Sequence, residues 1–230
     1  MAATLEILPD APLGARLVEQ LRARVLDGAI PPGERMNEVR LAAELGTSRT
    51  PVRAALSVLA GEGLLDYAPN RGYRVRLSPP REVEDAFQTR AVLEALAARQ
   101  AAEQGGFPPA ERAAAEAALA EGDAVLARGR LTAGPIAAYR LANVRFHEAV
   151  LAASGNRLLD RMVRLSLNLP LSSLNHIPRF TLDELRRRHD DHHRIFEAIT
   201  NRDGWRAELL MREHVLRVRD ATARQHPAPA

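Results

Sequence analysis

Two consecutive prolines, Pro79 and Pro80, interrupt the 230-residue chain and separate two parts of different character. Proline lacks an amide hydrogen and restricts the residue before it, so no regular helix or strand runs through this point unbroken. Residues 13–77 mix short helical patterns with a glycine-rich, strand-like end, whereas residues 81–225 repeat one helical pattern after another. We therefore predict two domains, residues 1–78 and residues 79–230.

The first domain has the pattern of three short helices followed by a hairpin. Gly28 is expected to end the first helix, Asn37 to cap the second, and Thr47-Ser48 to turn the chain into the third. The residues expected to face inward are Leu17, Val18, Leu21, Val25 and Leu26, then Val39, Leu41, Ala42 and Leu45, then Val52, Leu56 and Leu59. Alternating segments on both sides of residues 70–72 predict the hairpin. This order is that of a winged helix-turn-helix.

The second domain is predicted to be entirely helical, and Pro and Gly residues separate its helices. Thr181 and Glu184 have the spacing of a capping box, which marks one helix start. The six predicted helices cover approximately residues 81–104, 109–128, 135–153, 157–169, 182–201 and 204–224. The predicted fold class is mainly α, with an N-terminal winged helix-turn-helix and a C-terminal all-α six-helix bundle.

Composition narrows the class of protein further. The chain has no cysteine, which excludes disulfides and thiolate metal sites. Its N-terminal residues lack the basic and apolar regions of a signal peptide, and no apolar run is long enough to span a bilayer. We expect a soluble cytoplasmic protein without a membrane partner. The net charge of +3 does not by itself indicate nucleic-acid binding, so the positions of the charges decide.

The string ELGTSRTPVRAALSVLAGEGLL has the properties of a DNA-recognition helix. Such a helix needs small polar residues at its start and arginines that reach guanine edges. Ser48, Arg49, Thr50 and Arg53 supply these groups, and the i, i+4 step places both arginines on one face. The predicted DNA contacts in the helix are Ser48, Arg49, Thr50 and Arg53. At the hairpin tip, Asn70 and Arg71 can enter the minor groove or hold the DNA backbone, and Gly72 permits the tight turn. The alternative is a generic three-helix unit with solvated surface arginines.

Residues 13–76 resemble the GntR-type winged-helix domain. The resemblance covers LRARVLDGAIPPGERMNEVRLAAELGTSRTPVRAALSVLAGEGLL and the following NRGYRV. It implies that the seven residues named above contact double-stranded DNA. It also implies a homodimer that binds a palindromic operator.

Histidines concentrate in the second domain, where six of the seven lie between residues 147 and 214. Asn143 and His147 share one helix face, the fifth bundle helix carries His189, His192 and His193, and the sixth carries His214. If these helices converge, one oxygen and three imidazole nitrogens can bind a divalent cation. A solvated polar face or structural histidines are the alternative, and spacing alone does not decide between them.

The second domain resembles the FCD ligand-binding domain of the FadR branch of GntR-type regulators. The matching strings are FHEAVLAASGNRLL and HHRIFEAITNRDGWRAELLMREHV. The resemblance implies that His147, His192 and His214 bind a metal, with Asn143 where much of the family has Asp. Three imidazoles with one neutral oxygen suit zinc, nickel or manganese. Six helices in place of seven favour the VanR-like subgroup.

The same resemblance implies that the effector is a small organic acid. Arg90 stands where the family often has an arginine, and Arg140 lies one turn before Asn143, so both are predicted to bind the acid. An ion pair of Arg90 with Glu94 is the alternative.

We interpret the chain as an allosteric repressor or activator and not as an enzyme. The first alternative is a metal-dependent hydrolase with an attached DNA-binding module. It is disfavoured because no carboxylate is evidently placed as a general base beside the histidines, and Glu148 points about 100° away from His147 around its helix. The second alternative is a DNA binder that needs no effector.

Overall fold

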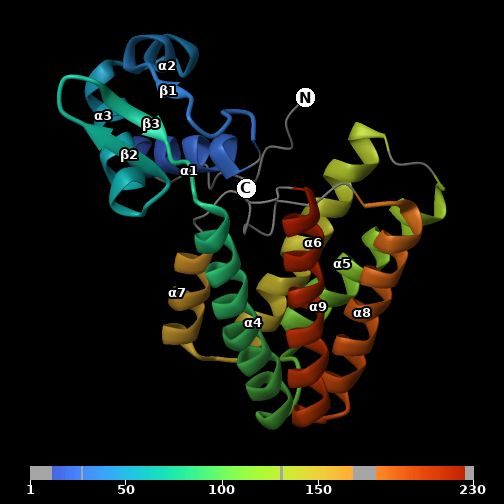
Figure 1. The fold of residues 1–230 in the computed structure, drawn as a ribbon. Coiled ribbons are helices and arrows are strands. Elements are labelled where there is room, and N and C mark those ends of the chain that lie inside the picture. Colours follow the sequence, from blue (N-terminus) through green and yellow to red (C-terminus); the bar gives the residue numbers. More distant parts are fainter. Residues whose placement is uncertain (1–11, 27, 130–131, 168–179, 226–230) are drawn as a thin grey trace. The chain divides into compact units, whose positions relative to one another are not determined.

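The structure is a computed structural model that describes residues 12–26, 28–129, 132–167 and 180–225. Its described residues form two compact units, of which the first ends at Ser78 and the second begins at Pro79. In these described ranges, nine helices and a three-stranded sheet account for the regular structure (Figure 1). The fold is therefore mainly helical, as predicted. No helix among the described residues is both long and apolar enough to cross a membrane.

The first unit is a winged helix-turn-helix. Its elements are α1 (Leu13–Leu26), β1 (Arg35–Met36), α2 (Glu38–Glu44), α3 (Arg49–Gly61), β2 (Leu65–Ala68) and β3 (Gly72–Val75). The strands form an antiparallel sheet in the order β1-β3-β2, in which Leu65 pairs with Val75 and Ala68 with Gly72. The hairpin of β2 and β3 is the wing, and its tip consists of residues 69–71.

The core of this unit contains most of the side chains that helical spacing predicts. Buried side chains are Leu17, Leu21 and Val25 from α1, Leu41 and Ala42 from α2, and Val52, Leu56 and Leu59 from α3, while Val18, Leu26 and Leu45 are partly buried. The prediction for Val39 is wrong, because this side chain is 60% exposed. Val39 lies about 200° around the helix from Leu41, so the two cannot face the same core.

Local signals set the ends of these elements. The Asn37 side chain accepts hydrogen bonds from the backbone N–H groups of Val39 and Arg40 and thereby caps α2. Ser48 occupies the N-cap position of α3, but its side chain makes no capping hydrogen bond. At the wing tip Asn70 has a φ of 62° and Gly72 a φ of 76°, so the turn needs residues that tolerate the left-handed region.

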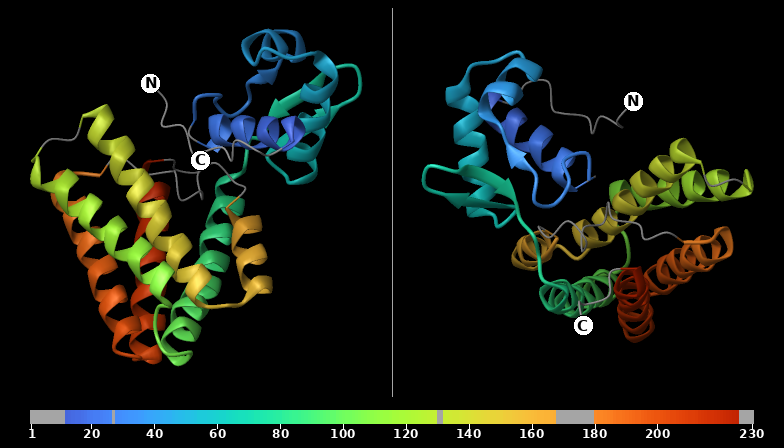
Figure 2. Two further views of the ribbon diagram at one scale, coloured as in Figure 1. Left: turned by 180° about the vertical axis from the view of Figure 1, so that it is seen from behind. Right: turned by 45° about the horizontal axis from the view of Figure 1, so that its top comes forward.

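The second unit is a bundle of six helices in its described residues. They are α4 (Pro80–Glu103), α5 (Pro109–Ala127), α6 (Ala133–Ala153), α7 (Arg157–Ser166), α8 (Leu182–Thr200) and α9 (Gly204–Gln225). Helix α4 packs against α6, α7, α8 and α9, while α5 packs against α6 and α8 (Figure 2). Helix α7 ends at Ser166 and not at 169 as expected, and residues 168 and 169 lie outside the described residues.

Small side chains allow the close approach of these helices. Ala91, Ala95, Ala98 and Ala102 repeat at helical spacing along α4, and each is at most 2% exposed. Alanine favours helix and leaves room for a neighbouring backbone. Thr181 and Glu184 form the predicted capping box at the start of α8, which fixes where that helix begins. The bundle therefore holds α4, α6, α8 and α9 at short distances from one another.

Candidate DNA-reading surface and candidate metal centre

The exposed face of α3 carries the predicted recognition residues. Ser48, Arg49, Thr50 and Arg53 are all exposed. Arg49, Thr50 and Arg53 line a surface hollow together with Ala54, Ser57 and Tyr73. The hollow therefore joins the start of α3 to strand β3, and two of its lining side chains are cations that can reach phosphates or base edges.

Glu38 at the start of α2 holds both arginines. Arg53 donates to Glu38 from Nε and Nη2, with the Nη2–Oε2 distance at 2.8 Å, and Arg49 Nη2 lies 3.4 Å from the same oxygen. The hydrogen bond from Arg53 lowers the pKa of Glu38 below its usual value, with a smaller contribution from Arg49. The carboxylate is thus ionised at neutral pH and aligns two guanidinium groups on one face.

The wing presents its tip to solvent. Asn70 and Arg71 are exposed, Gly72 is partly buried, and the Arg71 backbone N–H donates to the Ala68 carbonyl at 3.1 Å. The rings of Tyr67 and Tyr73 lie 4.9 Å apart between centroids and stiffen the two strands behind the tip. The tip is therefore a short, rigid turn with one cationic side chain.

Three histidines from three helices meet inside the bundle. His147 of α6, His192 of α8 and His214 of α9 are each at most 2% exposed. One ring nitrogen of each lies within 4.8 Å of the ring nitrogens of the other two. The Nε2 atoms of His192 and His214 are 3.1 Å apart. The structure thus brings together the three histidines that the sequence singled out.

This arrangement fits a divalent metal ion. Two nitrogens that bind one ion at about 2.1 Å lie roughly 3.0–3.4 Å apart, because the nitrogen–metal–nitrogen angle is between its octahedral and its tetrahedral value. Burial lowers the pKa of both His192 and His214 well below the usual value, and nearby positive and titratable groups add to this effect. Both imidazoles are therefore neutral at pH 7, which is the form that binds a metal.

Glu94 of α4 completes the surroundings of His147. Its Oε2 lies 2.5 Å from His147 Nδ1, and its Oε1 accepts a hydrogen bond from Arg90 Nε at 2.8 Å. A metal-binding histidine commonly donates its second ring N–H to a carboxylate, which orients the ring and sets its tautomer. This contact leaves Nε2 of His147 as the nitrogen for a metal.

A carboxylate that sequence spacing did not place beside the histidines is therefore present, where it is held by Arg90 and His147. Burial alone would raise the pKa of Glu94, but Arg90 and His147 outweigh it and lower the pKa to about 2. Sequence reasoning weighed Glu94 only as a partner of Arg90, because the convergence of α4 and α6 is not visible in helical spacing. The sequence feature that could have pointed to Glu94 is its spacing of four residues from Arg90, which places both side chains on one helix face.

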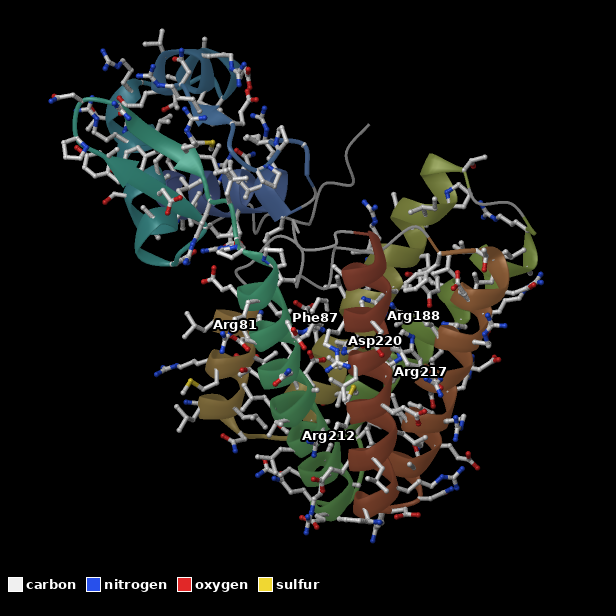
Figure 3. All side chains as sticks on the ribbon, in the orientation of Figure 1. Arg81, Phe87, Arg188, Arg212, Arg217 and Asp220 are labelled. Atoms are coloured by element: carbon white, nitrogen blue, oxygen red, sulfur yellow. The ribbon has the colours of Figure 1, made fainter. Side chains whose placement is uncertain are left out.

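The remaining predicted site residues lie nearby on the same helices. Asn143 is 4% exposed and stands one turn before His147 on α6. Arg90 is 3% exposed and forms the ion pair with Glu94 that was the alternative to effector binding. Arg140 is partly buried, and its Nε has no hydrogen-bond partner among the described residues. The side chains of the bundle are drawn in Figure 3.

A second group of possible ligands lies closer to the surface. One oxygen of Asp123 is 3.2 Å from His189 Nε2 and 3.1 Å from His193 Nε2. Asp123 and His193 are exposed, and the His189 Nε2 also contacts the Leu119 carbonyl at 3.1 Å. Hydrogen bonds account for this group without a metal, in contrast to the buried histidines.

A winged helix-turn-helix followed along the chain by an all-helical domain defines a class of protein, the DNA-binding transcriptional regulators with a separate helical domain. Comparison with known families agrees with this class. Residues 13–75 match the bacterial regulatory proteins of the gntR family, and residues 85–217 match the FCD domain. The chain belongs to the GntR family of transcriptional regulators and carries an FCD domain.

Individual relatives cover nearly the whole chain. A probable D-xylose utilization operon transcriptional repressor of Paenarthrobacter nicotinovorans is 29% identical over 97% of this chain and 94% of its own length. The HTH-type transcriptional repressor GlaR of Escherichia coli is 28% identical over 85% of this chain and 89% of its own length. The fold resembles that of Escherichia coli McbR/YncC, with a TM-score of 0.79 at 22% identity, covering 94% of this chain and 99% of that one.

These relatives are transcriptional regulators and not enzymes. The chain is accordingly a DNA-binding transcriptional regulator, and the hydrolase alternative has no support.

Proposed function

We propose that the chain is a repressor whose affinity for its operator is controlled by a small organic acid, bound at a divalent metal site in the bundle. The observation that carries the proposal is the buried convergence of His147, His192 and His214 inside an FCD domain. The two relatives named as repressors support the direction of control.

Operator reading is assigned to the start of α3 and to the wing. Arg49 and Arg53 leave Glu38 for guanine O6 and N7 or for phosphates, and Ser48 and Thr50 allow close approach of the helix end to the backbone. Asn70, Arg71 and Gly72 of the wing contact the adjacent groove or phosphates. Glu38 keeps the two guanidinium groups together until DNA replaces it.

The metal is assigned to the three histidines, with Asn143 as the oxygen donor. Zinc, nickel and manganese all accept this set of imidazoles and one neutral oxygen. When bound, the ion supplies a fixed positive charge to which a carboxylate oxygen can bind. Glu94 orients His147, and the low pKa values of His192 and His214 keep their nitrogens available to the ion near neutral pH.

The acid is assigned to the same centre, with Arg140 as a cationic partner on α6. Arg90 acts on the centre indirectly, through Glu94, because its guanidinium forms an ion pair with that carboxylate. A change in this centre reaches α4, α6, α8 and α9 together, since each contributes a side chain to it. Coupling of about 1–3 kcal/mol between acid and operator is typical of allosteric regulators.

Homodimer formation is supported by an exposed apolar stripe on α7. Leu158, Met162 and Leu165 follow helical spacing, and all three are at least 48% exposed. Val92 and Leu96 are also exposed on α4, which packs against α7. Contiguous exposed apolar side chains mark interfaces, so we assign this face to a second copy of the chain. A two-fold dimer matches a palindromic operator.

The experiment that tests the proposed function measures operator affinity. The operator is selected from random DNA with the purified protein, and its affinity is measured with metal-loaded and chelator-treated protein across a panel of organic acids. The proposal predicts that at least one acid weakens operator binding about fivefold or more, and only with metal present. Equal operator affinity under all of these conditions would contradict it.

A further inference from the structure

Arg188 of α8 carries a buried guanidinium for which the described part of the chain shows no ion pair. It is 6% exposed, and its Nε and Nη1 have no hydrogen-bond partner among the described residues. Figure 3 labels it in the half of the bundle where α8 begins. Taking a charge out of water is unfavourable unless a counter-charge and hydrogen bonds replace the water. A side chain of this kind therefore needs a partner from outside the described chain.

The two buried carboxylates among the described residues of the bundle, Asp191 and Glu94, are engaged by other side chains. Asp191 acts on Arg188 electrostatically, but its carboxylate is bound by Arg217 at 3.0 Å and lies 3.4 Å from Arg194. Glu94 is bound by Arg90 and His147. The ring of Phe180 lies 4.9 Å from the Arg188 guanidinium carbon and shields one face of it. Nε and Nη1 of Arg188, which have no partner among the described residues, can therefore donate to an anion.

Tyr139 of α6 supplies a second unused donor beside Arg188. It is 1% exposed, and its hydroxyl has no hydrogen-bond partner among the described residues. Burial raises the pKa of Tyr139 to about 12, so the hydroxyl keeps its proton at neutral pH. A buried tyrosine hydroxyl normally has a partner, and here an anion would provide one.

Both donors stand next to the metal ligands assigned above. On α6, Tyr139, Asn143 and His147 follow one another at steps of four residues and so share one helix face. On α8, Arg188 precedes His192 by the same step. The Tyr139 ring lies 5.8 Å from that of His189, which in turn lies 5.8 Å from that of His192. Arg188 is therefore one helical turn from His192, and Tyr139 is one turn from Asn143 and about two turns from His147.

We propose that Arg188 and Tyr139 form the anion-binding subsite of the effector centre, where they hold the carboxylate of a small organic acid. The carboxylate accepts hydrogen bonds from the guanidinium and from the tyrosine hydroxyl, and it neutralises the buried charge. The proposal rests on the proposed function, because it names the residues that recognise the acid at the same centre. It places the main cationic anchor on α8, whereas Arg90 is occupied by Glu94.

The first test is a thermal-shift titration of metal-loaded protein with acetate, glycolate, gluconate and citrate, against chloride at equal ionic strength. Wild type, Arg188→Gln, Tyr139→Phe and the exposed control Arg187→Gln are compared. We expect at least one acid to raise the melting temperature of wild type and of Arg187→Gln. The half-saturating concentration should rise about tenfold or more in Arg188→Gln, and by a smaller factor in Tyr139→Phe.

Two results of this titration would overturn the subsite. One is the same half-saturating concentration in Arg188→Gln as in wild type, and the other is no stabilisation of wild type by any of the four acids. Metal content, measured on the same samples, separates the two proposals. Stoichiometric metal with unchanged acid binding in Arg188→Gln would reject the subsite and leave the metal-dependent function intact.

A second measurement needs no ligand and keeps the proposal testable even if Arg188→Gln fails to fold. In the absence of acids, Arg188→Met should melt at or above the temperature of wild type, because it removes an unpaired buried charge. A clear loss of melting temperature in ligand-free Arg188→Met would show that Arg188 is a structural residue, and would overturn the proposal.

Discussion

Glu94 Oε2 lies 2.5 Å from His147 Nδ1, and both side chains are 2% exposed. With Arg90 on the other oxygen of Glu94, the three side chains form a buried chain from α4 to α6 that ends at the candidate metal centre. Such a carboxylate holds a metal-binding imidazole in one orientation.

Replacing Glu94 by Gln should therefore weaken metal binding without removing a metal ligand. We expect a loss of about 10- to 100-fold in metal affinity, measured by competition with a chromogenic chelator. Glu148→Gln is the matched control, because Glu148 follows His147 directly and is exposed. Equal affinities in the two variants, with both folded by circular dichroism, would remove Glu94 from the centre.

The identity of the oxygen donor can be tested at Asn143. Asn143→Asp places a charged oxygen one turn from His147 and should raise metal affinity on the order of tenfold. Asn143→Ala should lower it. If neither change alters metal affinity, Asn143 is not a ligand, and the ion is held by the histidines and water.

Operator recognition is expected to depend on Arg49 and Arg53 individually. Each change to Ala should cost about 1–3 kcal/mol of specific binding, the value of a bidentate base contact. Arg112→Ala, on the exposed face of α5 in the other unit, is the control. Operator affinity is measured by fluorescence anisotropy, and an unchanged value for Arg49→Ala would exclude that residue from base reading.

Glu38 is expected to restrain the same two arginines. Glu38→Gln removes the carboxylate that competes with DNA phosphates, so binding to unrelated DNA should strengthen and its salt dependence should become steeper. Binding to random and operator DNA is compared between 50 and about 200 mM salt. A loss of non-specific affinity in this variant would show that Glu38 positions the arginines more than it competes with DNA.

The metal-free bundle should lose stability in acid because of its buried histidines. The pKa values of His192 and His214 are lowered in the folded state, so below about pH 6.5 the unfolded chain binds protons that the folded chain does not. The free energy of unfolding should then fall by up to about 1.4 kcal/mol per pH unit for each histidine. Denaturant titrations from pH 8 to pH 5 measure this slope.

The slope should decrease in His192→Phe and in His214→Leu, but not in His193→Gln, which changes an exposed neighbour. The same slope in all three variants and in wild type would mean that other groups cause the acid sensitivity.

Much of this architecture follows from local sequence. Helical spacing placed Leu17, Leu56 and Leu59 in the core, and Thr181 with Glu184 marked the start of α8 because a capping box is a local interaction. The prediction that Val39 faces the core failed because a seven-residue helix buries only a narrow stripe of side chains. The apolar character of a residue does not by itself show on which side of the helix that residue lies. The family resemblance supplied the three histidines, which spacing alone left undecided.

What the sequence could not provide is the contact between helices far apart in the chain. Glu94 contacts His147 although 53 residues separate them, and Arg188 comes close enough to Tyr139 to act on it electrostatically only in the packed bundle. Arg90 of α4 and Arg188 of α8 cannot be distinguished by residue type alone. Only packing shows that Arg90 is neutralised by Glu94 and that Arg188 is not.

The central claim is that a metal-bound organic acid controls operator binding, and one measurement tests it most directly. Metal content is determined on protein purified without a histidine tag, and operator affinity is then measured with an acid that stabilises this protein, with and without chelator. We predict stoichiometric metal and a loss of operator affinity with the acid that disappears on chelation. Stoichiometric metal with operator affinity indifferent to the acid would contradict the account, as would an acid response that persists without metal.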